Sequence, residues 1–90
     1  NIYPREIENV LIEHPLLIDV AIIGIPDSMW GERLKAFVVT LPGAHISVAE
    51  MKIFCQDRLA SYKIPREVEE ISILPRNANG KVLKNSLRSA

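Results

Sequence analysis

The stretch from Leu74 to Lys84 joins a tight turn to a lysine that follows it directly. Asn79 and Gly80 both tolerate positive φ, which is typical of a hairpin turn. The next residue, Lys81, could carry its compact charge on a long stem to a carboxylate or phosphate oxygen. The alternative, which the local pattern alone favours, is a turn followed by a merely solvated lysine. The stretch is not a P-loop, because the upstream glycine and the Ser or Thr after the lysine are missing.

Two other segments place aromatic rings among polar residues. Trp30 is the only tryptophan and lies in a loop, where it could fill a hydrophobic gap or offer its face to a stacked ring. The local pattern favours the gap-filling role. Tyr62 precedes Lys63 and Arg66, a combination that fits a nucleotide-phosphate contact and equally fits an ordinary helix exit. Two histidines without an acidic ligand pattern, and one cysteine, predict no metal site.

The charge is balanced over the whole chain but not along it. The 90 residues carry 11 basic and 11 acidic side chains, and this neutral total argues against a general nucleic-acid or membrane-surface binder. Residues 1–57 have four basic and eight acidic side chains, a net of −4, and residues 58–90 have a net of +4. The positive segment is either a solvated face or a place where an anion is bound. The longest apolar run, residues 20–25, is about a third of a membrane span.

The hydrophobic pattern predicts a small α+β fold. Ser47 and Glu50 have the spacing of a capping box, so a helix should begin there and end near Ala60. Cys55 falls on the apolar stripe of that helix and should be buried and inert. The other expected elements are a helix over 4–13, strands over 19–25, 34–41 and 67–73, and a short helix over 83–89. This order predicts a three-stranded sheet packed against helices.

Taken together, these segments resemble the C-terminal domain of the adenylate-forming enzymes, which include acyl-CoA synthetases, peptide-synthetase adenylation domains and luciferases. The resemblance covers nearly the whole chain. It rests on N-I-Y-P-R-E-I-E at 1–8, the strand and turn at 20–27, W-G-E at 30–32, Y-K-I-P at 62–65, L-P-R-N at 74–77 and N-G-K at 79–81. The first motif and the closing N-G-K-V-L-K look like acyl-CoA synthetases for fatty or aromatic acids rather than peptide-synthetase domains.

The resemblance implies that residues 1–90 are the mobile C-terminal lid of an acyl-CoA ligase. Such an enzyme joins a carboxylic acid, here expected to be a fatty acid, to ATP as an acyl-adenylate, and CoA then displaces AMP. Lys81 corresponds to the family's catalytic lysine of the first step. After the lid rotates, the family's residues at the positions of Asn1, Trp30, Tyr62 and Arg66 contact CoA. This chain departs from the family at Ile64, where related ligases have a second basic residue that contacts the CoA phosphate.

The implied partners are a large N-terminal domain, ATP or the acyl-adenylate, and CoA, with no nucleic acid and no transmembrane segment. Mg²⁺ is expected to bind outside these residues. Because the family's phosphate loop and its adenine and acyl pockets are missing, we expect an inactive fragment of a cytoplasmic enzyme, which could associate peripherally with a membrane. Two alternatives stay open: a lid that serves a carrier protein, with Met29 and Trp30 as a docking patch, and a stand-alone anion-binding module.

Overall fold

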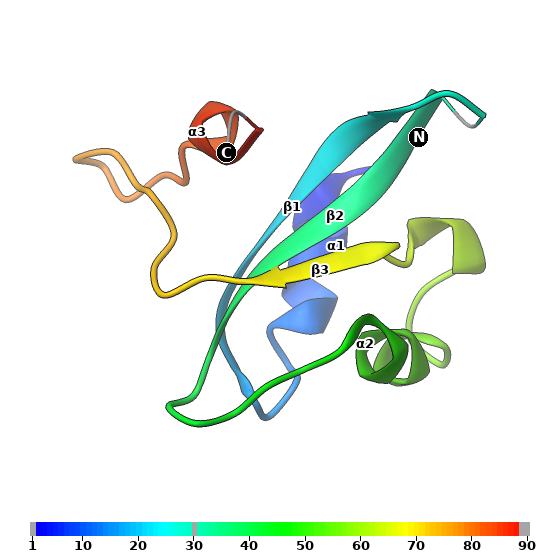
Figure 1. Ribbon diagram of the computed structural model, residues 1–90, viewed down its shortest axis with the longest axis horizontal. Helices are drawn as coiled ribbons and strands as arrows, with labels where there is room; N and C mark the ends of the chain where they lie inside the picture. Colours follow the sequence, from blue (N-terminus) through cyan, green and yellow to red (C-terminus); the bar gives the residue numbers. More distant parts are fainter. Residues whose placement is uncertain (1, 30, 89–90) are drawn as a thin grey trace.

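A computed structural model describes residues 2–29 and 31–88. The elements follow the order helix, strand, strand, helix, 3₁₀ turn, strand, helix (Figure 1). Their bounds are α1 (Pro4–Leu11), β1 (Leu17–Asp27), β2 (Gly31–Thr40), α2 (Val48–Cys55), η1 (Ser61–Lys63), β3 (Glu67–Glu70) and α3 (Lys84–Arg88). The three-stranded sheet with helices confirms the predicted α+β class.

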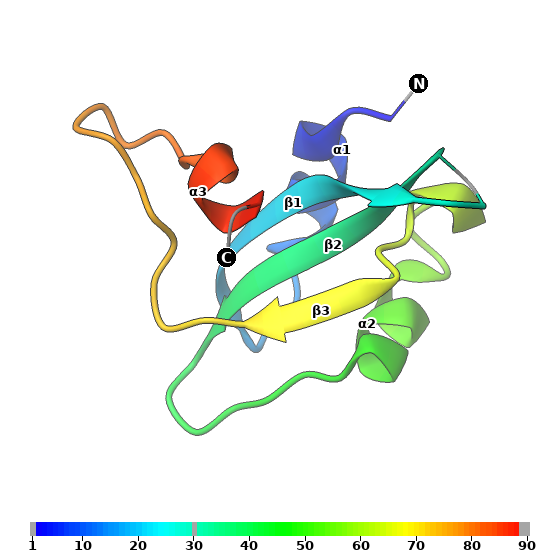
Figure 2. The same cartoon turned by 45° about the horizontal axis from the view of Figure 1, so that its top comes forward.

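The strand β2 lies in the middle of the sheet. It pairs antiparallel with β1 through a long hairpin and parallel with the short strand β3. The chain needs α2 and η1 to cross back between β2 and β3, because parallel neighbours require a crossover connection (Figure 2). The strands β1 and β3 are therefore the two edges of the sheet.

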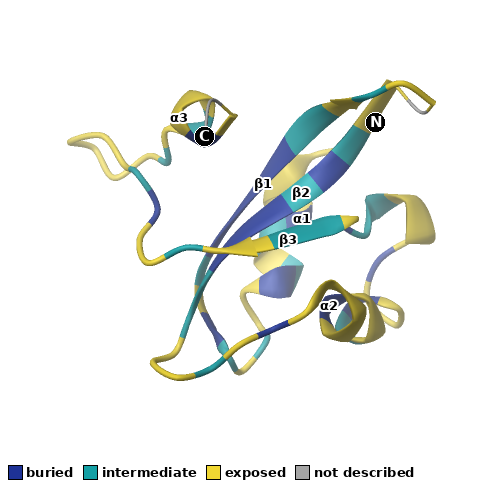
Figure 3. Cartoon of the chain, in the orientation of Figure 1, coloured by how far each residue is buried: buried dark blue, intermediate teal, exposed yellow. Residues whose placement is uncertain are grey.

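Both faces of the hairpin are covered, which explains the almost continuous apolar run in β1. Val20 and Ile22 face the cluster formed with α1 and α2, which includes Ile7, Leu11, Met51 and Cys55. Their neighbours Ala21 and Ile23 face the opposite side, where they pack with Phe37, Leu74 and Leu87. The middle of the hairpin is buried, as Figure 3 shows. The sequence of a strand that is buried on both faces has a continuous apolar run instead of alternating apolar and polar residues.

Several element ends differ from the expectation. The first helix ends at Leu11, and the second ends at Cys55 because the backbone N–H groups of Arg58 and Leu59 both donate to the Cys55 carbonyl in a closing turn. The hairpin extends beyond the predicted strands, and the expected turn at Pro26 begins only after Asp27. The third strand stops at Glu70, which leaves Ile73 exposed. No helix within the described ranges is long and apolar enough to cross a membrane.

Candidate functional site

Lys81 follows a tight turn that the side chain of Asn77 organises. The Gly80 N–H donates to the Asn77 carbonyl at 2.9 Å, and Gly80 has φ +84°, a conformation that favours glycine. The Asn77 Oδ1 accepts from the N–H groups of Asn79 and Lys81 at 2.9 and 3.0 Å. The Asn77 N–H in turn donates to the Lys81 carbonyl at 2.9 Å. Both backbone groups of Lys81 are therefore fixed, which confirms the predicted tight turn.

Arg76 links this turn to the sheet. One guanidinium nitrogen donates to the Gly80 carbonyl at 2.6 Å, and another donates to both carboxylate oxygens of Asp19 at 2.7 and 2.8 Å. Asp19 belongs to β1, so the contact joins the turn to the edge of the sheet. Close by, the Lys84 ammonium lies 2.9 Å from Oε2 of Glu8 on α1.

The Lys81 side chain is exposed and, within residues 2–29 and 31–88, forms no hydrogen bond or ion pair through its ammonium group. Lys63, Arg76 and Lys84, its neighbours in the positive segment, are each paired with a carboxylate. Lys81 borders an open groove of about 1290 Å³ between α1 and the segment 76–86, across which Arg5 also lies. A free ammonium on a fixed turn is suited to contact an anion that enters this groove.

Tyr62 and Arg66 lie at the other end of the molecule. The tip of the β1–β2 hairpin and η1 lie at the end opposite the turn 77–81 in both views (Figures 1 and 2). Tyr62 is 64% exposed as a residue. Arg66 is also exposed, and its backbone N–H donates to the Leu34 carbonyl at 2.9 Å. Ile64 instead packs against the core. Trp30 and Asn1 lie outside the described residues.

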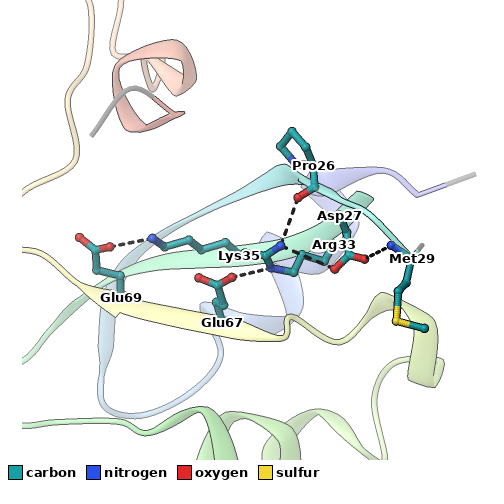
Figure 4. Close-up of polar contacts among 7 residues, drawn as sticks. All are labelled: Pro26, Asp27, Met29, Arg33, Lys35, Glu67 and Glu69. Atoms are coloured by element: carbon teal, nitrogen blue, oxygen red, sulfur yellow. Dashed lines mark hydrogen bonds and ion pairs between the residues drawn. The ribbon is translucent and has the colours of Figure 1, made fainter. Parts of the chain in front are cut away.

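Charged pairs hold the base of the hairpin tip (Figure 4). Arg33 donates to Glu67 at 2.5 Å and to the Pro26 carbonyl at 3.1 Å, and it lies 3.6 Å from Asp27. The hydrogen bond to Glu67 raises the pKa of Arg33. The Asp27 carboxylate accepts from the Met29 N–H at 2.9 Å, so one network joins β1, β2, β3 and the start of the tip.

Residues 6–81 match the family model of the AMP-binding enzyme C-terminal domain. The chain belongs to this family. It is 46% identical over 88 residues to a fatty acid–[acyl-carrier-protein] ligase, ScoC, of Streptomyces coeruleorubidus, covering 98% of this chain and 17% of that protein. It is 45% identical over 87 residues to a long-chain-fatty-acid–CoA ligase of Bacillus subtilis, covering 97% and 16%.

The solved structures agree with the fold of this AMP-binding enzyme C-terminal domain. The o-succinylbenzoate CoA synthetase (MenE) of Bacillus subtilis, in complex with its acyl-adenylate intermediate OSB-AMP, superposes with a TM-score of 0.92 at 40% identity. The match covers 100% of this chain and 18% of MenE. The chain thus spans less than a fifth of the length of these relatives, all of which are named as ligases or synthetases.

Sequence reasoning singled out Lys81 of this AMP-binding enzyme C-terminal domain as a candidate, and it missed the residues that hold the two ends of the molecule in place. Arg76 and Asp19 are 57 positions apart, and Arg33 and Glu67 are 34 apart, so no local pattern links them. Cys55 is buried, as predicted, and burial raises the pKa of its thiol. The described part of the chain contains no group of three or more His, Cys, Asp or Glu side chains that could hold a metal ion.

Proposed function

We propose that residues 1–90 form the mobile C-terminal lid of an acyl-CoA ligase that activates a fatty or aromatic acid, and that Lys81 serves its adenylation step. Membership of the AMP-binding enzyme C-terminal domain family supports this assignment. The observation that carries it is the contrast within the positive segment, where neighbouring cations are paired while the Lys81 ammonium is exposed on a fixed backbone. The larger N-terminal domain would supply the acyl and ATP sites, together with any Mg²⁺.

In the first step, a carboxylate oxygen of the acid attacks the α-phosphorus of ATP. The bond to the bridging oxygen breaks, and pyrophosphate leaves with its electron pair. Two anions must approach each other, so a cation already in place between them lowers the repulsion and orients the attack. Lys81 would donate hydrogen bonds to the carboxylate and to an α-phosphate oxygen. The step requires no proton transfer from Lys81.

In the second step, the lid turns its other end to the acyl-adenylate. The sulfur of CoA attacks the acyl carbonyl carbon, AMP leaves with the electrons of the acyl–phosphate bond, and the thiol proton passes to solvent or a base. Tyr62 and Trp30 would contact the adenine nucleotide of CoA, Arg66 its phosphate, and Asn1 the pantetheine arm. The exposure of Tyr62 and Arg66, at the end opposite Lys81, supports two separate working ends on one rigid body.

A second candidate acceptor is a carrier protein rather than free CoA. Two observations favour it: a relative with 46% identity is named as a fatty acid–[acyl-carrier-protein] ligase, and Met29 at the hairpin tip is 82% exposed. The tip would then contact the surface of the carrier protein. Thioester formation by the full-length parent enzyme, measured with CoA and with a phosphopantetheinylated carrier protein, separates the two acceptors.

Lys81→Ala in the full-length parent enzyme tests the proposal. We expect ATP–pyrophosphate exchange to fall ~100-fold, or about 3 kcal/mol, as for the loss of one preorganised electrostatic contact. Transfer of the acyl group from supplied acyl-adenylate to the thiol should change little. Lys52→Ala is the matched control, because Lys52 on α2 is also exposed and its ammonium makes no hydrogen bond or ion pair with the residues that the structure describes. Equal losses in both half-reactions would falsify the role of Lys81.

A further inference from the structure

We infer that Arg76, clamped by Asp19, is a positioning residue that fixes Lys81 for adenylation. The inference rests on the proposed role of Lys81. The carbonyl that Arg76 binds at 2.6 Å belongs to Gly80, whose peptide bond leads directly into Lys81. Holding that carbonyl sets the orientation of the peptide plane from which Lys81 departs, because a peptide unit is planar.

The flanks of the turn are anchored in the core, where Leu74 is buried and Val82 packs against the same cluster, but the turn itself is held mainly by polar contacts. Residues 76–81 are all exposed, so the turn buries no apolar side chain of its own. Asn77 fixes the backbone of Lys81, but Asn77 belongs to the same turn and moves with it. The contact between Arg76 and Asp19 is the one recorded link that passes from these residues to the sheet, among the residues described.

Arg76 is suited to this link by its shape. The planar guanidinium presents several donors in a fixed fork, so it can bind both oxygens of Asp19 and the Gly80 carbonyl together. Asp19 lies on β1 next to Val20, which is buried in the core. A continuous series of contacts therefore runs from the buried strand through Asp19 and Arg76 to the peptide before Lys81.

The ion pair between Arg76 and Asp19 also indicates that Arg76 supports Lys81 and is not itself a second ligand for the substrate. Its charge is compensated by Asp19 at 2.7 Å, whereas the Lys81 ammonium has no recorded partner in residues 2–29 and 31–88. Removal of Arg76 should leave Lys81 present but loosely placed. When a substitution far from the reacting atoms displaces a catalytic group by about 1 Å, the rate can fall about 100-fold.

The test uses Arg76→Ala in the full-length parent enzyme. We expect kcat for ATP–pyrophosphate exchange to fall at least about tenfold, with KM for ATP and acyl transfer from supplied adenylate nearly unchanged. In a Lys81→Ala background, Arg76→Ala should cost almost nothing more, because the two residues act as one unit. Lys35→Ala is the control: it removes the 2.7 Å ion pair with Glu69 and should leave exchange unchanged.

The outcomes are distinguishable. Suppose that Lys81→Ala selectively impairs exchange, but Arg76→Ala lowers the exchange rate by the same factor in the Lys81→Ala background as in the wild-type enzyme. The positioning role of Arg76 is then overturned, and the proposed function stands. If Lys81→Ala leaves exchange intact, both are overturned. Asp19→Asn keeps the size of the side chain and loosens the clamp, so it should show a smaller loss of the same selective kind. An Asp19→Asn enzyme with unchanged exchange, or with equal losses in both half-reactions, counts against the inference even if Arg76→Ala does not fold.

Discussion

Replacement of Glu8 should destabilise the domain through one partly buried hydrogen bond. Its carboxylate Oε2 accepts from the Ile22 N–H at 2.8 Å and lies 2.9 Å from the Lys84 ammonium. Since β1 is an edge strand, the described sheet has no strand on the side away from β2 that could accept from this N–H. Glu8 thus binds α1 to the sheet edge and to the start of α3 with one side chain.

The size of the effect follows from the burial of Ile22, which is 0% exposed. Glu8→Ala leaves the Ile22 N–H without an acceptor, which lowers the free energy of unfolding by about 1–3 kcal/mol. It also removes an ion pair worth at most about 1 kcal/mol. A total of about 2–3 kcal/mol should lower Tm by roughly 10–20 °C for a domain of this size. Glu8→Gln keeps an amide oxygen as acceptor and loses only the charge that faces Lys84, so it should cost about 1 kcal/mol or less.

Thermal unfolding of the 90-residue chain, followed by circular dichroism, compares the three proteins. The expected order of Tm is wild type, then Glu8→Gln close below, then Glu8→Ala far below. Lys84→Ala is the matched control for the ion pair and should resemble Glu8→Gln. If Glu8→Gln loses as much as Glu8→Ala, the charge pair rather than the edge hydrogen bond holds α1, and the reasoning from the buried Ile22 N–H is refuted.

Three further predictions concern Trp30, Glu70 and Cys55. Trp30→Ala in the parent enzyme should raise KM for CoA and leave pyrophosphate exchange intact; loss of both would support the gap-filling role. The pKa of Glu70 is lowered from 4.5 by the Ile46 N–H and by His45, so its contribution to stability is complete above pH 4.5 and is lost as pH falls through the lowered value. Glu70→Gln should therefore flatten the acid side of a Tm–pH curve. The Cys55 thiol, buried and with a raised pKa, should react with iodoacetamide slowly in the native chain and quickly in urea.

Local patterns predicted what depends on neighbours in the chain. The capping box is present in both directions, with the Glu50 N–H donating to Ser47 Oγ at 3.1 Å and the Ser47 N–H donating to Glu50 Oε1 at 2.9 Å. The turn before Lys81 was predictable for the same reason, since Asn77 and Gly80 complete it within a few residues. Signals of this kind need no knowledge of the rest of the fold.

The end of α2 was predicted wrongly because Arg58 continues the helical spacing of the apolar stripe. In the structure its guanidinium donates to the Phe54 carbonyl at 2.6 Å and lies 4.0 Å from the centre of the Phe54 ring. Arg58 thus covers an aromatic surface beside the closing turn instead of extending the helix. Spacing alone does not distinguish a helical position from a side chain that folds back on the preceding turn.

The parallel pairing of β2 with β3 could not be predicted from either strand. Lys35 faces Glu67 in the register, and the ion pairs of Arg33 with Glu67 and of Lys35 with Glu69 exist only because the chain crosses back through α2. A run of charged residues such as β3 has no apolar pattern that fixes its partner. The backbone ladder with β2 and the packing of Val68 against the core hold this edge strand, and the two ion pairs add to them.

The +4 segment has a different meaning once the chain is folded. All recorded ion pairs but the one between Arg33 and Asp27 join a residue of 1–57 to a residue of 58–90. Three of the seven basic residues of 58–90, namely Lys63, Arg76 and Lys84, thus have their charge compensated by carboxylates of 1–57. A lysine that is left unpaired on such a surface acts only where its turn places it. Under the proposed function, selectivity for the reacting anions would come from the position of Lys81, and hence from the contacts of Asn77, Arg76 and Asp19 around it.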